Sequence, residues 1–179
     1  MKILVTGGSG FIGHILIPRL IKSGHEVVAT SRNTNSEPTG ATFHPIAELG
    51  PDTDWSFALS KVDAVIHLAA KVHVMSHNTS NPIADYRRIN AEGTVKLAKD
   101  AAEAGVRHFI FMSTIKVNGE TSGLMPFRAQ DIPAPRDPYA VAKHEAEEAL
   151  LKMVRQSSMH ATIIRPPLVY GPGVKGNFI

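Results

Sequence analysis

A tyrosine and a lysine four positions apart, Tyr139 and Lys143, have the residue types and the spacing of an acid–base pair. They follow Asp137-Pro138, a capping side chain and a proline, which is how many helices begin. On that helix both side chains share one face, so the ammonium can stabilise the phenolate and lower a phenol pKa that is ordinarily about 10. A tyrosine tuned in this way can serve as acid or base near neutral pH. Because such pairs are common by chance, the prediction depends on partners elsewhere in the chain.

Two hydroxyl residues, Ser113 and Thr114, are the predicted partners of that pair. They directly follow residues 107–112, an apolar run with the composition of a strand. In parallel sheets, ligands bind beyond the carboxyl ends of the strands. We therefore expect both hydroxyls to lie in a ligand site.

The stretch TGGSGFIG at residues 6–13 places four glycines in eight positions. In the spacing of Gly7, Gly10 and Gly13, the first glycine allows a tight turn, the second lets the backbone approach a pyrophosphate, and the third lets a helix pack on a strand. The phosphates would lie at the helix N-terminus, where unpaired N–H groups and the helix dipole favour an anion. A glycine-rich turn without a ligand is the alternative, but the strand before and the helix after favour nucleotide binding.

The end of the second predicted strand reads Thr30-Ser31-Arg32-Asn33. Sites that bind NAD usually carry an Asp or Glu about 20 residues after the glycines, where it bonds the ribose hydroxyls. This chain has no carboxylate there, and the Arg32 guanidinium could pair with a 2′-phosphate. The sequence therefore favours NADP over NAD. The alternative is that Arg32 is an ordinary surface residue at the end of a strand.

Strand and helix patterns alternate along the chain. The apolar runs predict strands at 2–6, 26–31, 41–46, 63–68, 107–112 and 161–165, and the helical patterns lie at 11–23, 81–104 and 138–156, with a weaker one at 54–60. Residues 117–137 form the longest irregular stretch, which is expected to cover something as a lid or loop. The alternation predicts an α/β fold of the Rossmann type, a doubly wound parallel sheet with helices on both faces.

Composition narrows the class of protein. A chain of 179 residues that is 43% hydrophobic is most simply one domain. The absence of cysteine excludes thiol catalysis and zinc–thiolate sites, and it fits a reducing, cytoplasmic setting. The net charge is +3 and the positive residues are scattered, so neither a nucleic-acid partner nor a membrane is predicted. No metal site is predicted either.

Six motifs resemble those of the extended short-chain dehydrogenase/reductase family, in particular its nucleotide-sugar epimerases, dehydratases and reductases. In chain order they are TGGSGFIG at 6–13, HLAA at 67–70, NAEGT at 90–94, FMST at 111–114, PYAVAK at 138–143 and RPPLVYGPG at 165–173. The resemblance covers the whole chain and implies a Rossmann fold.

The resemblance also implies roles for single residues. Tyr139 would be the acid/base, Lys143 would hold the nicotinamide ribose and lower the tyrosine pKa, and Thr114 would bond the reacting sugar oxygen. Together with the residues above, the predicted cofactor-binding set is Gly7, Gly10, Phe11, Ile12, Gly13, Ser31, Arg32, Leu68, Ala69, Ala70, Asn90, Ser113, Tyr139, Lys143 and Pro166. The predicted substrate-binding set is Lys71, Thr114, Lys116 and Asn177.

The activity that the resemblance implies is an NAD(P)-dependent nucleotide-sugar 4-epimerase of the UDP-hexose type. Such an enzyme oxidises the sugar at C4 and reduces it again from the other face. Family dehydratases carry an Asp-Glu pair directly after the hydroxyl residue, where this chain has Ile115 and Lys116, so dehydration is not expected. The expected partner is a nucleotide sugar, and a homodimer is a possible state.

Two alternatives stay open. An NADPH-dependent 4-keto nucleotide-sugar reductase would fit Arg32 better than an epimerase does. An alternative of another class is a non-catalytic dinucleotide-binding module, against which the intact Thr114, Tyr139 and Lys143 argue, because a binding module needs none of them.

Relatives in this family continue well beyond the last motif and add a small C-terminal substrate domain. Residues 1–179 are therefore expected to form the NAD(P)-binding Rossmann domain with the catalytic residues, and the substrate domain is expected to be absent. Catalysis depends on close positioning of the reacting carbon. The chain is thus expected to bind the dinucleotide while it turns over nucleotide sugars slowly or not at all.

Overall fold

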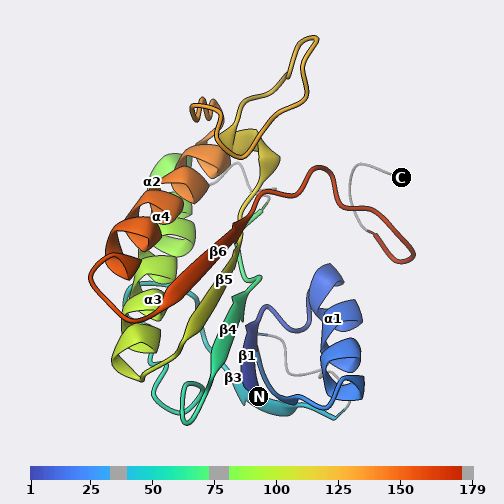
Figure 1. Cartoon of the computed structure of the whole chain (residues 1–179), viewed down its shortest axis with the longest axis vertical. Coiled ribbons are helices and arrows are strands. Elements are labelled where there is room, and N and C mark those ends of the chain that lie inside the picture. Colours follow the sequence, from blue (N-terminus) through green and yellow to red (C-terminus); the bar gives the residue numbers. More distant parts are fainter. Residues whose placement is uncertain (33–39, 73–80, 175–179) are drawn as a thin grey trace.

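The computed structural model describes residues 1–32, 40–72 and 81–174, and it has one six-stranded sheet with helices on both faces (Figure 1). The strands are β1 (Lys2–Thr6), β2 (Glu26–Ser31), β3 (Thr42–Pro45), β4 (Ala64–His67), β5 (His108–Met112) and β6 (His160–Ile164). All neighbouring strands are parallel, in the order β3-β2-β1-β4-β5-β6. This is the strand order of the dinucleotide-binding Rossmann fold, so the predicted fold class is confirmed.

The core has two parts, one on each face of the sheet. The α-helices are α1 (Phe11–Lys22), α2 (Pro82–Tyr86), α3 (Gly93–Glu103) and α4 (Pro138–Val154). Figure 1 shows α1 on one side of the sheet and α2, α3 and α4 on the other. Because successive side chains of a strand point to opposite faces, Val5 of β1 packs in the cluster of Ile17 from α1, and Leu4 packs in the cluster of Leu97 from α3.

Two helix predictions differ from the structure. Residues 54–60, predicted as a weak helix, form no helix, and residues 56–60 are turns. Leu59 N donates to Trp55 O at 2.9 Å, and the buried Trp55 and Leu59 pack into the core. The predicted helix 81–104 is divided into α2, the π-helix η2 (Arg87–Glu92) and α3. Single π-helical turns are often found at functional sites, and this one carries a predicted cofactor residue, Asn90.

The irregular stretch predicted at 117–137 contains no helix or strand except at Val117, which ends a short 3₁₀-helix, so residues 118–137 are irregular. They follow the short 3₁₀-helix η3 (Ile115–Val117) and lead into α4. In Figure 1 they project from the same end of the molecule as the start of α4. None of the helices in the described residues is long and apolar enough to cross a membrane.

Candidate active site

The glycine-rich turn between β1 and α1 leaves no room for side chains. Gly7 has a φ of 70°, and a Cβ there would lie 2.8 Å from the backbone N of Ala69 after β4. A Cβ on Gly13 would lie 2.5 Å from the carbonyl O of Gly8. The turn is therefore pressed against the end of β4 on one side and against the first turn of α1 on the other, as the glycine spacing predicts.

The N-terminus of α1 fits an anionic group. Its N-cap is Gly10, which supplies no side-chain cap, and its first turn contains no acidic residue. The N–H groups of such a turn have no partner within the helix and carry the positive end of the helix dipole. With no Cβ at the glycines, a phosphate can approach these N–H groups closely. The residues present thus fit the pyrophosphate of a dinucleotide.

A buried hydrogen-bond network joins this turn to β4 and α3. Thr6 Oγ1 donates to His67 Nδ1 at 2.6 Å, and His67 Nε2 donates to Thr94 Oγ1 at 2.9 Å. The Thr94 hydroxyl in turn donates to the Asn90 carbonyl at 2.8 Å, and Thr6 Oγ1 accepts from Ala69 N at 3.2 Å. Burial, with a smaller effect of Lys143, lowers the pKa of His67 to about 3. His67 is therefore a neutral, structural histidine that holds the ends of β1 and β4 together.

The side-chain amide of Asn90, a predicted cofactor residue, is hydrogen-bonded to the backbone of Lys71. Its Oδ1 accepts from Lys71 N at 2.8 Å, and its Nδ2 donates to Lys71 O at 2.9 Å. The Lys71 ammonium pairs with Asp85 at 3.0 Å. Asn90 is almost fully buried. It therefore fixes the segment of Leu68, Ala69 and Ala70 that follows β4, and we expect any effect of Asn90 on a cofactor to be indirect.

The end of β2 lies beside the glycine-rich turn. The Ser31 hydroxyl, largely buried, forms a hydrogen bond with the Ser9 hydroxyl in that turn. Arg32 directly follows β2 and is exposed. The structure thus places Arg32 at the predicted strand end, next to residues of the glycine-rich turn.

Tyr139 and Lys143 lie on the first turns of α4, whose N-cap Asp137 accepts a hydrogen bond from Ala140 N at 2.8 Å. The Tyr139 ring meets the Tyr86 ring edge-on, with the ring centroids 6.1 Å apart. The Lys143 ammonium is buried and lies 4.0 Å from the centroid of the Phe111 ring on β5. Helix and sheet thus hold both side chains in fixed surroundings.

The expected lowering of the Tyr139 pKa is wrong for this structure. Burial raises that pKa to about 12, and the charges of Asp137 and Tyr86 add to the shift. Burial also lowers the pKa of Lys143 to about 7, partly opposed by the negative charge of Glu147. The physical reason is that burial penalises both charged forms, and the ammonium lies against the Phe111 ring.

Ser113 and Thr114 follow β5 as predicted but have different surroundings. The Ser113 hydroxyl is buried and donates to Glu147 of α4, so its side chain is committed to the protein. Thr114 caps η3, with its Oγ1 accepting from Lys116 N at 3.4 Å, and it is half-buried. Of the two hydroxyls, Thr114 is the better placed for a ligand.

Two further predicted residues lie close to Thr114. Pro166, after β6, accepts a backbone hydrogen bond from Ile115 N at 2.9 Å. The Lys116 ammonium pairs with Asp137 at 2.8 Å, which joins the segment after β5 to the start of the helix of Tyr139. Asn177, the remaining predicted substrate residue, lies outside the described residues.

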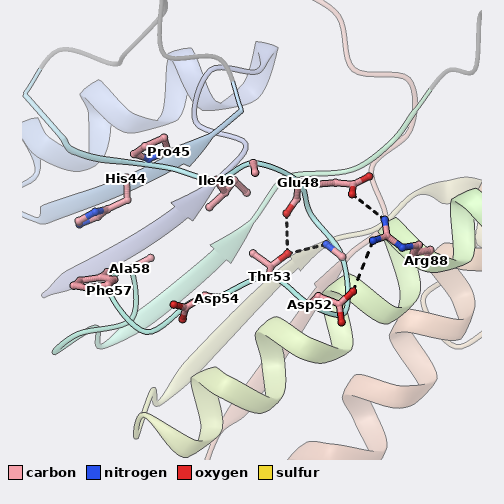
Figure 2. Close-up of a pocket in the computed structure, with 12 residues that line it drawn as sticks. His44, Pro45, Ile46, Glu48, Asp52, Thr53, Asp54, Phe57, Ala58 and Arg88 are labelled. Carbon is pink, nitrogen blue, oxygen red and sulfur yellow. Dashed lines mark hydrogen bonds and ion pairs between the residues drawn. The ribbon is translucent and has the colours of Figure 1, made fainter.

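A cavity of about 470 Å³ lies elsewhere, along β3 and the segment that follows it (Figure 2). At one end of it Arg88 pairs with Glu48 at 2.9 Å and with Asp52 at 3.8 Å. No residue of the predicted site lines this cavity. The candidate active site is the set of residues at the carboxyl ends of β1, β4 and β5 and at the start of α4.

Sequence reasoning missed Glu147 and Arg165, which are hydrogen-bonded to each other, with Arg165 also bonded to Asn118. The available signal was the position of Glu147, four residues after Lys143 on the same helix. A carboxylate at that spacing faces the same way as the lysine. Nothing in the sequence, however, indicated that Arg165 would meet it.

Comparisons with known proteins agree with this geometry. The chain is 43% identical over 179 residues to a UDP-glucose 4-epimerase of Vibrio cholerae, a match that covers 99% of this chain and 54% of that protein. Among solved structures, MoeE5 in complex with UDP-glucuronic acid and NAD has a TM-score of 0.84 at 30% identity, covering 99% of this chain and 58% of the other. UDP-glucose 4-epimerase from Thermotoga maritima with UDP-glucose has a TM-score of 0.79 at 30% identity, covering 92% and 55%.

The chain spans about half the length of these relatives. The sequence profile of the NAD dependent epimerase/dehydratase family matches residues 3–178. With the strand order, the glycine-rich turn and the pair on α4, this match means that the chain belongs to the NAD dependent epimerase/dehydratase family.

Proposed function

We propose that the protein acts as a nucleotide-sugar 4-epimerase on UDP-hexoses, with residues 1–179 as the domain that binds the nicotinamide dinucleotide and carries the catalytic residues. The observation that carries the proposal is the grouping of Thr114 after β5 and Tyr139 and Lys143 on α4 in a chain with the glycine-rich turn of a dinucleotide site. The 43% identity to a UDP-glucose 4-epimerase supports the substrate class.

The dinucleotide would be held by three segments. The backbone of Gly10, Phe11 and Ile12 at the start of α1 would bind the pyrophosphate, because unpaired helix N–H groups favour an anion. Ser31 at the end of β2 and Arg32 directly after it would face the adenosine ribose, and Leu68 to Ala70 after β4 would lie along the cofactor. When bound there, the nicotinamide would supply a hydride acceptor for oxidation at sugar C4 and the same hydride for the reduction that follows. Relatives with this fold contain NAD in their solved structures.

Tyr139 would accept the proton of the sugar 4-hydroxyl and later return it. At neutral pH a phenol with a pKa of about 12 keeps its proton, so Tyr139 is ready to donate one. To accept a proton it must first become a phenolate, a form that burial disfavours in this structure. The proposal therefore requires that the Lys143 ammonium, on the same helix, offset this effect when the dinucleotide and the sugar are bound. Thr114 would donate a hydrogen bond to the same sugar oxygen and orient it.

The diphosphate of a nucleotide sugar is negatively charged, and a cation outside the dinucleotide site would stabilise it. Lys116 is about half exposed and sits between Thr114 and the N-cap of α4, so it is the described lysine best placed for this contact. Lys71 is a second candidate on the segment after β4, although its ammonium is engaged by Asp85. Both assignments require that the lysine exchange its carboxylate partner for phosphate.

The cofactor balance tests the proposed reaction. With UDP-glucose or UDP-galactose and a small amount of NAD, we expect any epimer that forms, even at a slow rate, to appear without consumption of NAD and with no absorbance of reduced nicotinamide rising in step with product. The reason is that an epimerase returns the hydride it takes. Chromatographic analysis of the UDP-sugars, with absorbance followed in the same sample, measures both quantities.

A reductase would behave differently in the same assay. One NADPH consumed for each product molecule, with a 4-keto nucleotide sugar as substrate, would replace the epimerase with the reductase. Dinucleotide binding with turnover of neither substrate class, in a protein that includes residues beyond 179, would indicate the binding module instead.

Arg32 supports NADP as the preferred dinucleotide, since it is exposed directly after β2 and no carboxylate stands there. We expect Arg32→Asp to shift the affinity ratio toward NAD, because the variant loses a cation for the 2′-phosphate and gains a charge that repels it. Titration calorimetry with NAD and NADP measures the ratio. Arg19→Asp, at the far end of α1, is the charge-matched control. An unchanged NADP/NAD ratio in Arg32→Asp would make Arg32 a surface residue only.

A further inference from the structure

A buried carboxylate, Glu147, lies one helical turn after Lys143 on α4 and is 1% exposed. It accepts a hydrogen bond from the Ser113 hydroxyl at the end of β5. Arg165, directly after β6, donates to both carboxylate oxygens, with Nη2 2.5 Å from Oε2 and Nε 3.0 Å from Oε1. Three elements that border the candidate site therefore meet at one carboxylate.

The same arginine extends the contact to residues 118–137. Arg165 Nη1 donates to Asn118 Oδ1 at 3.1 Å, and Asn118 Nδ2 donates to the carbonyl of Arg128 at 2.9 Å. Asn118 is 5% exposed and directly follows η3, the 3₁₀-helix that Thr114 caps. Because residues 118–137 have no secondary structure of their own, these side-chain bonds fix the base of the segment.

The energetics of a buried ion pair indicate what this arrangement contributes. Removing a carboxylate and a guanidinium from water costs about as much free energy as their attraction returns, so such a pair adds little net stability. A guanidinium that binds both oxygens of a carboxylate does, however, impose a defined direction on both groups. The pair of Glu147 and Arg165 is thus suited to fixing positions rather than to stabilising the fold.

We propose that Glu147 is a positioning residue of this site. Its carboxylate fixes the helix of Tyr139 and Lys143 to the ends of β5 and β6, and through Arg165 and Asn118 it holds the base of residues 118–137 in the same frame. The inference that this arrangement serves catalysis rests on the proposed function. The effects of Glu147 on the Lys143 pKa and on residues 118–137 do not depend on that function.

The charge of Glu147 also acts on Lys143. Burial lowers the pKa of this lysine to about 7, and the carboxylate one turn further along α4 opposes that shift. Tyr139 on α4 and the buried His67 on β4 are uncharged at neutral pH. The Arg165 guanidinium is charged, and its pairing with Glu147 offsets part of the carboxylate's effect on Lys143. The negative charge of Glu147 therefore favours the protonated form of Lys143.

Glu147→Gln tests this role, because the amide keeps the size of the side chain but loses its charge and presents an NH₂ group to Arg165. The matched control is Glu148→Gln, the same change at the next, exposed position, where the carboxylate lies 3.8 Å from His144. NMR on protein with ¹³C-labelled lysine follows the titration of Lys143 with pH. We expect the midpoint of this titration to fall by about one pH unit or more in Glu147→Gln and to stay unchanged in the control. The signal missing in Lys143→Met identifies the resonance.

Trypsin provides a second, independent readout of the same variants. Without the Glu147 carboxylate, the Arg165 guanidinium loses the partner that holds it in place for Asn118. Cleavage after Arg128 should therefore become several-fold faster in Glu147→Gln relative to cleavage after the exposed Lys61. Asn118→Ala should accelerate that cleavage while it leaves the Lys143 midpoint unchanged. If Glu147→Gln fails to fold, Asn118→Ala still tests whether the hydrogen bonds of Asn118 hold the base of residues 118–137.

The outcomes separate this proposal from the proposed function. A Lys143 midpoint and an Arg128 cleavage rate equal to those of Glu148→Gln would overturn the role of Glu147, as would an unchanged cleavage rate in Asn118→Ala. Both readouts hold whether or not the protein turns over a sugar. In a protein that does epimerise, Glu147→Gln should lower kcat much more than it changes KM, because the reacting groups rather than the substrate contacts are displaced.

Discussion

Replacement of Tyr139 by phenylalanine is expected to lower kcat for epimerisation by about 10²- to 10⁴-fold, the usual contribution of a positioned acid or base. The variant loses the oxygen that moves the proton but keeps the ring that packs edge-on against Tyr86. Dinucleotide affinity, measured by calorimetry, should be nearly unchanged. Product analysis of UDP-sugars over a fixed time gives the rate.

Tyr86→Phe is the control for that variant. It removes a phenol oxygen from the neighbouring ring, where the hydroxyl donates to Val72 O at 3.4 Å, and it leaves the ring contact in place. We expect a rate within a few fold of the unmodified protein. Equal losses in both variants, or a Tyr139→Phe protein with almost full activity, would remove Tyr139 from its role as the acid/base.

Gly13→Ala is expected to have the largest effect on dinucleotide binding. The new Cβ would lie 2.5 Å from the carbonyl O of Gly8 and 2.7 Å from that of Gly7, so the turn must move away from α1. Overpacking of this kind costs about 1–3 kcal/mol. If that cost falls on the bound state, it corresponds to a loss of about 5- to 150-fold in affinity. Titration calorimetry with NAD and NADP measures the loss.

The control for the glycine variant is Gly50→Ala. A Cβ at Gly50 would meet the Arg88 guanidinium at 3.6 Å, an ordinary contact, and this position lies in the cavity away from the glycine-rich turn. We expect its dinucleotide affinity to stay unchanged. A thermal melt of both variants separates loss of binding from loss of folding. Normal affinity in a folded Gly13→Ala protein would contradict a pyrophosphate at the N-terminus of α1.

The parts of this structure that sequence predicts are those encoded locally. The glycine spacing of Gly7, Gly10 and Gly13 specifies a turn whatever surrounds it, and the alternation of apolar strands with helices specifies a parallel sheet. The family motifs then indicate which strand ends carry the ligand site. These local signals located Thr114, Tyr139 and Lys143 on the elements where the structure has them.

What sequence does not predict depends on contacts between distant residues. Ser113 was expected to line the cofactor, but its hydroxyl turns to Glu147, 34 positions away in the chain. The Asn90 amide binds the Lys71 backbone, and Asn90 lies in a π-helical turn that interrupts the predicted helix. The direction of the Tyr139 pKa shift depends on how much of the ring is buried, which is a property of packing and not of the YxxxK spacing.

The most direct test of the epimerase proposal follows the hydrogen at C4 of the sugar. UDP-glucose that carries deuterium at C4 should be converted, with a small amount of NAD, into the C4 epimer with the deuterium still at C4, because the hydride leaves and returns within one site. NMR and mass spectrometry of the product measure the retained label. Full retention with NAD unconsumed is the predicted result, whereas exchange of the deuterium for solvent hydrogen, or loss of one cofactor per sugar, would contradict the proposal.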